Sequence, residues 1–439
     1  MNTKLLTLSL LLPVAIVRAA DWPQVGGPRG GYSVEDPGLT WGEPKVAWRF
    51  KLTGNSGPGQ AVIAGGIVYV LDQHEKDSVA ILRGIGLDDG KERWQIKWTT
   101  PADTAAESNK RPFGTPAVAG DRIYIVGPAP YRDSAGLRAI DLKTRQVAWV
   151  VEPAKDGLVL HASASPIVVD DLVLVNVKEA GKDAVLALDR ATGAKRWKCA
   201  LPFIPNGTGV MQNAPQLAVF DGVRQIVVHH PNGVTGVSLD GKVLWTNAGY
   251  QRKTLTATPS VSSNGFIYVS SGHEGSCAMF RVTRVNGAWQ CATVFADGEK
   301  QKGEMQEGLN LPHLIFGNWN IVSGAWWNRH LFAVGTKGLH CLDETGRVVW
   351  TSGENPGKPG WNPCVIAVND RLLHIAGNGR KAGNLVVAEA NATGYKQLGE
   401  VKVHSKMTVT QLAYSNGRVV SQYEDDGELV CVELGTHKP

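Results

Sequence analysis

Short apolar runs separated by polar turns recur along almost the whole chain, and no long helical periodicity interrupts them. In each unit, an apolar run rich in β-branched residues is followed by a Gly, Asn or Asp turn and a second apolar run. This is the pattern of a strand, a turn and a strand. Eight such pairs of strands are predicted, at residues 59–71, 114–126, 164–175, 213–228, 258–270, 322–334, 362–376 and 410–422.

A second motif lies between these pairs and ends in a large apolar residue. Its fullest copy, ALDRATGAKRW, contains the turn-forming residues Asp189, Thr192 and Gly193 and ends at Trp197. A lone hairpin cannot bury an indole of this size, so we expect it to pack on the neighbouring unit. The residues that end the copies are Trp48, Trp94, Trp149, Trp197, Trp245, Trp289, Trp350 and Leu398.

The copies follow one another at intervals of about 44 to 61 residues, which indicates stacked supersecondary units. Each unit takes its strands A and B from the apolar pair and its strands C and D from the second motif. The predicted fold is therefore all-β, an eight-bladed β-propeller of four-stranded antiparallel blades. Seven blades are the alternative, because the copy that ends at Trp289 is degenerate.

The number of strands also predicts how the ring closes. After the last apolar pair only residues 429–434 remain as a strand, so the eighth blade lacks its outer strand at the C-terminus. A surplus copy at residues 46–52, which contains Trp48, can complete it. Such closure removes the exposed edges of an open array, and it predicts a single propeller over residues 46–435.

The first 19 residues have the features of a secretory signal. Lys4 precedes an apolar stretch that is too short to span a bilayer, and Val17 and Ala19 are small residues suited to cleavage after Ala19, or alternatively after Ala20. No cysteine occurs early enough for a bacterial lipid anchor. We therefore expect a soluble, monomeric protein that does not span a membrane and is periplasmic or secreted.

Residues 20–45 form a Pro- and Gly-rich stretch that we expect to be an extended arm, pinned to the side of the propeller by Trp22 and Trp41. The formal net charge of +5 falls to +3 when Lys4 and Arg18 are removed with the signal (5 − 2). Basic residues are scattered rather than clustered with aromatic ones, which argues against a nucleic-acid partner.

The six cysteines are too sparse for a disulfide framework, and we expect buried thiols. A two-residue turn at Asn286-Gly287 would set Cys291 opposite Val282. Metal binding by the pair His229-His230 would need further ligands, for which His273 and His161 are candidates only by loop position, so one histidine of the pair is expected to hydrogen-bond within its loop. The loop carboxylates form no spaced oxygen cluster for calcium, so no metal site is predicted.

The motif Ala-x-Asp-x-x-Thr-Gly-x-x-x-Trp resembles the tryptophan-docking repeat of the pyrroloquinoline quinone (PQQ) propeller superfamily, and so does the opening DWPQVGGPRGGYS. The resemblance covers about residues 21–434. It implies the propeller fold, but a repeat that packs blades says nothing about chemistry. One branch of the superfamily comprises quinoprotein alcohol dehydrogenases with PQQ and calcium. Another comprises scaffolds similar to the outer-membrane assembly protein BamB, which keep the repeat without the cofactor.

The resemblance to the dehydrogenase branch is incomplete, because that branch typically holds PQQ against a vicinal Cys-Cys disulfide and this chain has no adjacent cysteines. BamB-like scaffolds are typically lipoproteins, and the lipidated cysteine is missing too. The absent cofactor clamp favours a non-catalytic binding or protein-interaction scaffold without a cofactor. A PQQ-dependent dehydrogenase that oxidises alcohols or sugars, with calcium and a divergent site, is the alternative.

Loops between strands D and A and between B and C gather on one face of a propeller, around the channel, where ligands usually bind. Their basic, amide and aromatic side chains would suit a small anionic or quinone-like ligand or a peptide edge from an envelope or extracellular partner. The long loop at residues 296–320 is expected to cover part of the channel mouth. The predicted ligand-binding residues are Arg111, His161, Asn213, Arg252, Lys253, Trp319, Trp361, Asn362, Arg380 and Lys406.

No catalytic residue can be assigned from the sequence, because a general base is recognised by its geometry first. A polysaccharide hydrolase or lyase is a third possibility that draws on Trp319, Trp361 and His161. It would need a carboxylate pair or a base that faces the channel.

Overall fold

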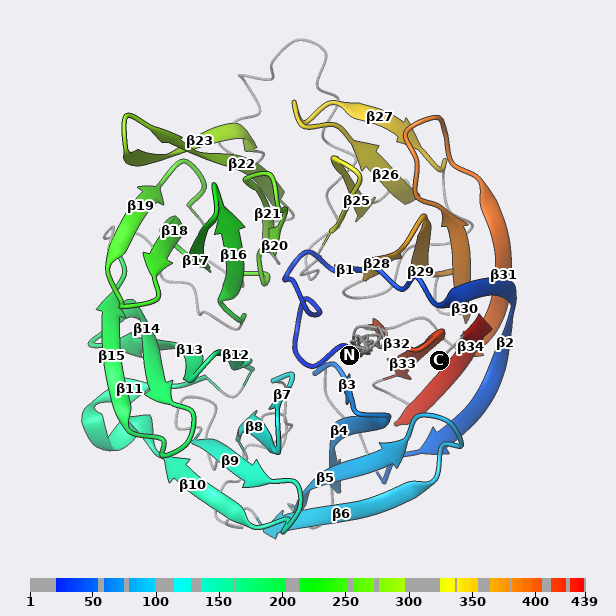
Figure 1. The fold of residues 1–439 in the computed structure, drawn as a ribbon, viewed down its shortest axis with the longest axis horizontal. Helices are drawn as coiled ribbons and strands as arrows, with labels where there is room; N and C mark the ends of the chain where they lie inside the picture. Colours follow the sequence, from blue (N-terminus) through cyan, green and yellow to red (C-terminus); the bar gives the residue numbers. More distant parts are fainter. Residues whose placement is uncertain are drawn as a thin grey trace, which may run out of the picture.

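Eight small β-sheets are arranged in a ring around a central axis (Figure 1). This computed structural model describes residues 21–53, 59–74, 79–99, 114–127, 136–161, 163–202, 213–251, 256–271, 276–296, 324–335, 338–353, 364–378, 381–404, 412–423 and 427–437. Within these residues the only helical element is the 3-10 turn η1 (Pro153–Asp156). The prediction of an all-β, eight-bladed propeller is confirmed.

The first four blades follow one another along the chain, each with its strands in sequence order from the axis outward. Blade 1 consists of β3 (Val62–Ala64), β4 (Ile67–His74), β5 (Val79–Gly86) and β6 (Glu92–Thr99); blade 2 of β7 (Ala117–Ala119), β8 (Arg122–Val126), β9 (Leu137–Asp141) and β10 (Val147–Val151); blade 3 of β12 (Ile167–Val169), β13 (Leu172–Glu179), β14 (Lys182–Asp189) and β15 (Lys195–Ala200), with the short β11 (Leu158–Val159) added on β13; and blade 4 of β16 (Gln216–Phe220), β17 (Val223–His230), β18 (Gly233–Ser238) and β19 (Val243–Asn247).

The next blades continue the pattern and all are antiparallel meanders. Blade 5 consists of β20 (Ser260–Val261), β21 (Phe266–Ser271), β22 (Ser276–Val285) and β23 (Ala288–Ala296); blade 6 of β24 (Ala325–Trp327), β25 (His330–Gly335), β26 (Gly338–Leu342) and β27 (Val348–Thr351); blade 7 of β28 (Val365–Val368), β29 (Arg371–Asn378), β30 (Lys381–Glu389) and β31 (Gln397–His404); and blade 8 of β32 (Leu412–Ser415), β33 (Arg418–Tyr423), β34 (Glu428–His437) and the N-terminal β2 (Leu39–Lys51).

Blade 8 is closed by the N-terminal strand, as predicted. Strand β2 pairs antiparallel with β34, and the register sets Val46 opposite Val432 and Lys51 opposite Glu428. The strand begins at Leu39, seven residues before the predicted start at Val46. The last strand of the described chain therefore pairs with a strand from its N-terminal part, which is the outermost strand of this blade (Figure 1).

The middle strands of each blade are the most apolar part of the fold. In blade 3, β13 and β14 are buried along most of their length, whereas the outer strand β15 is half exposed. Middle strands face a neighbouring blade on each side, so both of their faces need apolar residues. The hydrophobic core is accordingly divided into clusters that lie between adjacent blades.

The N-terminal arm circles the axis and contacts the innermost strand of every blade. In blades 1 to 3, the main-chain oxygens of Trp22 and Pro23 accept from the Ile63 and Val118 amides, and the side-chain oxygen of Gln24 accepts from the Val168 amide. In blades 4 and 8, the main-chain oxygen of Val25 accepts from the Gln216 side chain, and the Asp36 side chain accepts from the Tyr414 hydroxyl. In blades 5 to 7, the main-chain oxygens of Gly30, Gly31 and Tyr32 accept from the amides of Val261, Trp326 and Ala367.

This course differs from the expected arm on the side of the propeller. Trp22 is fully buried at the inner end of blade 1, while Trp41 lies in β2, where the guanidinium of Arg371 stands 5.9 Å from its ring. The short strand β1 (Ser33–Val34) pairs parallel with β28 of blade 7. Because innermost strands have a free edge, the arm satisfies main-chain amides that would otherwise lack partners.

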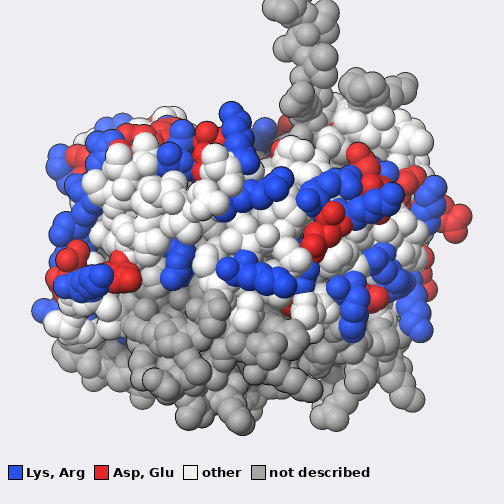
Figure 2. Space-filling view, turned by 90° about the horizontal axis from the view of Figure 1, so that it is seen from below, with Lys and Arg blue, Asp and Glu red and all other residues white. Residues whose placement is uncertain are grey.

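Basic and acidic side chains are interspersed over the side of the ring in Figure 2, without a large patch of one sign. Many of them form exposed ion pairs, such as Arg224 with Asp170 and Lys45 with Glu433. This distribution matches the scattered charges of the sequence. Among the described residues, no helix has the length and apolar character that crossing a membrane requires.

Candidate functional site

Most of the predicted channel-face ligands lie outside the described residues, as does nearly all of the loop at residues 296–320. The proposed lid over the channel mouth therefore stays a prediction. The predicted ligands outside the described residues are Arg111, Arg252, Lys253, Trp319, Trp361, Asn362, Arg380 and Lys406.

Two predicted ligands, His161 and Asn213, are described, and both are buried in contacts within the fold. The Nδ1 atom of His161 accepts a hydrogen bond of 3.1 Å from the Ser163 amide. Asn213 accepts from the Asn176 side chain at 2.7 Å and donates to the carbonyl oxygens of His229 and Ala257 at 2.8 and 3.0 Å.

Asn213 consequently links blades 3, 4 and 5 with both ends of its amide. Its two donor hydrogens and its oxygen are all used, and the side chain is only 3% exposed. A ligand could reach this amide only by displacing contacts between blades, which would leave buried polar groups unpaired. In the structure, the amide of Asn213 serves contacts between blades, and its role in ligand binding stays a prediction.

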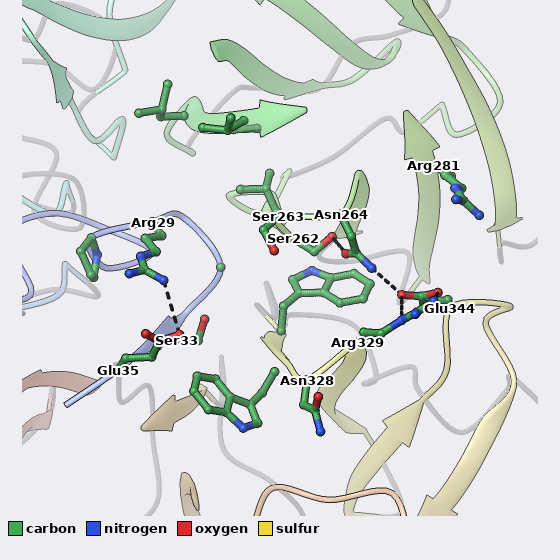
Figure 3. Close-up of a pocket in the computed structure, with 18 residues that line it drawn as sticks. Arg29, Ser33, Glu35, Ser262, Ser263, Asn264, Arg281, Asn328, Arg329 and Glu344 are labelled. Carbon is green, nitrogen blue, oxygen red and sulfur yellow. Dashed lines mark hydrogen bonds and ion pairs between the residues drawn. The ribbon is translucent and has the colours of Figure 1, made fainter. Parts of the chain in front are cut away.

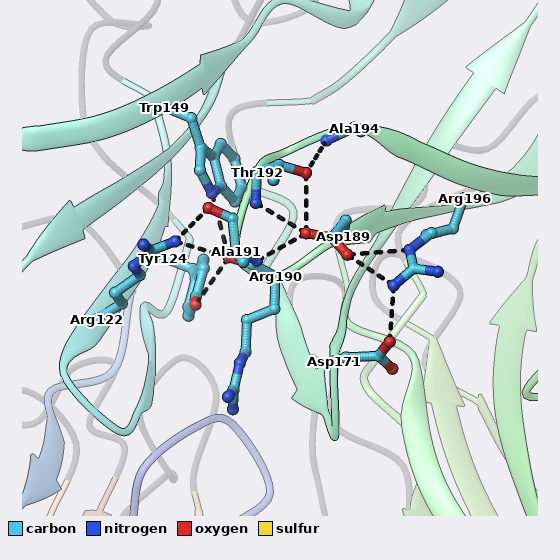
Figure 4. A network of polar contacts seen from close by, with 10 residues as sticks. All are labelled: Arg122, Tyr124, Trp149, Asp171, Asp189, Arg190, Ala191, Thr192, Ala194 and Arg196. Carbon is cyan, nitrogen blue, oxygen red and sulfur yellow. Dashed lines mark hydrogen bonds and ion pairs between the residues drawn. The ribbon is translucent and has the colours of Figure 1, made fainter.

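The contact between blades 2 and 3 shows how the tryptophan motif works (Figure 4). The indole Nε1 of Trp149 donates to the main-chain oxygen of Arg190 at 3.2 Å, in the turn of the next blade. Gly193 in that turn has a φ of +75°, and a Cβ there would lie 2.8 Å from the indole ring. Glycine is thus required both for the backbone conformation and for the close approach.

The turn itself is organised by Asp189. Its Oδ1 accepts from the amide and the hydroxyl of Thr192, at 2.8 and 2.9 Å, and its Oδ2 accepts from Arg196. These hydrogen bonds, first from the Thr192 side chain, then from its amide and from Arg196, lower the pKa of Asp189 to about 2. The short side chain thereby holds the backbone in the shape that the indole contacts.

Other predicted docking residues make the same kind of contact. Trp48, Trp197 and Trp350 donate to the oxygens of Leu87, Leu239 and Asn391 in the following blade, at 2.7, 3.0 and 2.9 Å. Two other predicted docking residues, Trp245 and Trp94, make different contacts. Trp245 donates to Gln225 of its own blade, and the Trp94 ring lies 5.8 Å from the guanidinium of Arg145, which has a φ of +60° at the position of the motif glycine.

Trp289 and Leu398 do not occupy the docking position. Trp289 pairs with Arg284 near the tip of the long β22–β23 hairpin, and Phe295 instead packs under Gly346 of blade 6. Leu398 is 41% exposed, because a bulge in β31 excludes it from the pairing with β30. Its neighbour Gly399 takes the paired position and contacts Pro44 of β2.

The histidine pair lies at the end of strand β17, not in the loop where the sequence suggested it. His229 Nδ1 is 3.0 Å from the oxygen of Ala257, and His230 Nε2 is 2.9 Å from the hydroxyl of Thr235. Burial, with a smaller contribution from His229, lowers the pKa of His230 to about 3. A neutral, buried and hydrogen-bonded His230 has a structural role.

All six cysteines are free thiols. Cys291 lies opposite Val282, as the two-residue turn at Asn286-Gly287 predicted. Burial raises the pKa of Cys291 and Cys364 to about 12, so these thiols have little nucleophilic character.

A pocket of about 880 Å³ opens where the turns of blades 4, 5 and 6 meet the arm (Figure 3). The A–B turns of blades 5 and 6 contribute Asn264 and Arg329, and the turn after β26 contributes Glu344. Three neighbouring blades and the arm therefore build it together. Its described lining consists of Pro28, Arg29, Gly31, Ser33, Glu35, Leu217, Ala218, Val219, Val261, Ser262, Ser263, Asn264, Arg281, Trp326, Trp327, Asn328, Arg329 and Glu344.

One ion pair dominates the pocket wall. Arg329 donates to both oxygens of Glu344, at 2.9 and 2.6 Å, and Asn264 donates to the same carboxylate. The Arg329 hydrogen bond is the main cause that lowers the pKa of Glu344, and Arg281 contributes through its charge. Arg329 adopts a φ of +64° in the tight turn, a strained conformation for a non-glycine residue. At neutral pH this wall is ionised and internally paired.

This pocket was not predicted from the sequence. A signal was present in the run Trp326-Trp327-Asn328-Arg329, which occupies a hairpin turn without glycine, and in Arg29 of the opening motif. However, no local pattern relates residues so far apart in the chain. Among the described residues, no group of three or more His, Cys, Asp or Glu side chains could hold a metal ion.

Comparisons with known proteins agree with the ring and its repeats. Residues 43–214 match the family model described as outer membrane protein assembly factor BamB. No curated protein matches the sequence. Among solved structures, the quinohemoprotein alcohol dehydrogenase from Comamonas testosteroni is 13% identical, with a TM-score of 0.63 over 96% of this chain and 82% of that chain.

Two further structures show the same similarity. The quinohemoprotein alcohol dehydrogenase ADHIIG from Pseudomonas putida HK5 is 13% identical, with a TM-score of 0.59 over 95% of this chain and 81% of that chain. A europium-containing methanol dehydrogenase is 12% identical, with a TM-score of 0.53 over 94% of this chain and 98% of that chain. At such low identity these likenesses establish the fold alone.

The fold and the contacts between blades define the protein as an eight-bladed propeller built from tryptophan-docking repeats. Over residues 43–214 the family match agrees with the resemblance to PQQ-like repeat propellers that the sequence predicted.

Proposed function

We propose that the protein is a non-catalytic binding scaffold of the cell envelope, similar in role to BamB-like propellers. The observation that carries this proposal is the chemistry of the pocket. Its described lining contains arginines, carboxylates, amides, hydroxyls and two indoles, but no histidine, cysteine, lysine or tyrosine. Such a lining offers hydrogen bonds, charge and apolar contact, which are the means of recognition.

The same pocket is poorly suited to acid–base chemistry. A general base for neutral pH needs a pKa raised toward 7, as burial of a carboxylate can achieve. Glu344 has its pKa moved the opposite way, because Arg329 and Asn264 hold it as a carboxylate. A carboxylate held in this manner is suited to binding and orienting a ligand.

Two further points support the scaffold role in the envelope. The apolar stretch after Lys4 and the small residues before Ala20 suit export, and the match of residues 43–214 is to an assembly factor of the outer membrane. We therefore propose that residues 1–19 are removed and that the mature protein works in the periplasm or outside the cell as a monomer.

The first test is calorimetric titration of the purified mature protein with PQQ, with and without calcium. We expect no binding heat at high micromolar PQQ. In parallel, chemical cross-linking in envelope preparations followed by purification should recover a defined protein partner.

Binding of PQQ at micromolar concentrations, lost on Trp319→Ala or Arg380→Ala, would contradict the scaffold role. It would instead support the alternative of a PQQ-dependent dehydrogenase for alcohols or sugars, with a divergent cofactor site among loop residues outside the described part of the chain. A dye-reduction screen with alcohols and sugars would then be the next measurement.

A further inference from the structure

The pocket between the arm and blades 4 to 6 contains more positive than negative charge. Three arginines and two glutamates line its described wall. Arg329 donates two hydrogen bonds to Glu344, and Asn264 donates to the same carboxylate, so these two opposite charges are paired with each other. The described lining therefore carries one positive charge in excess.

Two arginines are available to a ligand. Arg281 is exposed and has no hydrogen bond or ion pair within the described part of the chain; its guanidinium stands 5.1 Å from the ring of Phe266. Arg29 forms an exposed ion pair with Glu35 at 3.7 Å, beyond hydrogen-bond distance, and a ligand carboxylate can compete for a contact of this kind. Figure 3 shows Arg29 and Arg281 on opposite sides of the pocket, with Ser262 and Asn264 between them.

The pocket also presents apolar surface between these charges. Val219 is 46% exposed near the end of the innermost strand of blade 4. Trp327 is half-buried at the start of the blade 6 turn. Tryptophan and arginine are enriched in the energetically important regions of protein interfaces.

We propose that this pocket binds an extended acidic segment of a partner protein, with an apolar side chain against Val219 and Trp327 and carboxylates on Arg29 and Arg281. The inference rests on the proposed scaffold function and specifies the partner. The planar guanidinium of an arginine can donate two parallel hydrogen bonds to a carboxylate, so it fixes the orientation of the ligand as well as attracting it. The separation of the two arginines favours a ligand with acidic groups at both ends over a single small anion.

The test is selection from a random twelve-residue peptide library displayed on phage, with the intact mature protein as bait. We expect the selected peptides to be enriched in aspartate and glutamate on both sides of an apolar residue. Synthetic copies should bind Arg281→Gln and Arg29→Gln each about fivefold more weakly, since one exposed ion pair contributes up to about 1 kcal/mol. Arg281→Lys should retain part of the affinity.

Arg284→Gln is the matched control, because Arg284 is an exposed arginine on the same strand β22 but stacks on Trp289 outside the pocket. Its affinity for the peptides should equal that of the wild type. Selected peptides without acidic enrichment, or acidic peptides that bind the Arg29→Gln/Arg281→Gln double variant as tightly as the wild type, would overturn the inference.

The two proposals can fail separately. If a partner is cross-linked equally well to the wild type and to the double variant, the scaffold function stands and the pocket is not its site. If PQQ binds and no partner is recovered, the proposed function itself fails.

Discussion

The contact of blade 2 with blade 3 and the contact of blade 5 with blade 6 use related turns but different partners. In both turns an aspartate, Asp189 or Asp343, accepts from the amide and hydroxyl of a threonine. Both contain a glycine with positive φ, and a Cβ on Gly193 or Gly346 would meet an aromatic ring within 2.8 or 2.5 Å. The two turns therefore share the aspartate, the threonine and the glycine, although the turn at Asp343 is one residue shorter.

The ring that fills the two turns differs. Trp149 adds an indole hydrogen bond to the Arg190 oxygen, whereas Phe295 has no polar atom to donate. The tryptophan of blade 5, Trp289, lies six residues earlier, under the guanidinium of Arg284. The comparison teaches that a tight glycine turn and a flat apolar ring are sufficient to join two blades, and that the indole hydrogen bond is an addition.

The largest effect should come from removing the rings. Trp149→Ala and Phe295→Ala each leave a cavity between two blades, and we expect each to lower the free energy of unfolding by about 3–5 kcal/mol. Trp289→Ala removes a ring near the tip of a hairpin, and we expect a loss below about 1 kcal/mol. Urea unfolding followed by tryptophan fluorescence and circular dichroism measures all three. A loss for Trp289→Ala as large as that for Phe295→Ala would show that the assignment of Phe295 is wrong.

A smaller effect is expected at the glycines. Gly193→Ala and Gly346→Ala combine an unfavourable positive φ with a Cβ that meets the docked ring, so we expect losses of about 2–3 kcal/mol. Gly287→Ala is the control, because Gly287 has a φ of +82° and nothing within 4 Å of the added atom. Its loss should be about 1 kcal/mol, from the backbone alone. Equal losses at the three positions would refute the role of close packing.

Much of the fold was predictable because its signals are local. The turn at Asp189, Thr192 and Gly193 is set by side chains that bond their own backbone, so a single copy of the motif shows it. The pairs of strands follow from the alternation of apolar and polar residues. The closure by β2 follows from the one strand that the eighth blade lacks at the C-terminus. These features need no knowledge of what lies across the ring.

The features that were missed depend on distant neighbours. No pattern near Trp289 in the sequence indicates that blade 6 packs on the β22–β23 hairpin at Phe295, which is six residues further along the chain. Likewise, the bulge that excludes Leu398 serves a contact with Pro44, from the other end of the chain. The arm and the pocket are extreme cases, because Arg29 and Glu344 come together only when the ring has closed.

The candidate site was the least predictable part. The predicted channel face drew on loop residues chosen by topology, and Asn213 shows the weakness of that choice, since its amide is committed to three blades. A polar side chain in a loop looks the same in sequence whether it serves a ligand or a neighbouring strand. Only the count of its hydrogen-bond partners separates the two roles.

The smallest effect concerns the aspartate that organises the turn between blades 2 and 3. Because hydrogen bonds lower the pKa of Asp189 to about 2, below its ordinary value of 3.8, the carboxylate stabilises the fold at pH values above about 4, and this contribution is lost as the pH falls toward 2. Asp189→Asn should therefore unfold at a lower urea concentration than the wild type at pH 6, and the difference should shrink steadily between pH 4 and pH 2. Thr192→Val, which removes the hydroxyl donor but keeps the carboxylate, should show a smaller difference at pH 6 that shrinks over the same range. A difference that is independent of pH would mean that the asparagine disturbs the shape of the turn, and that charge contributes nothing to holding Arg190 against Trp149.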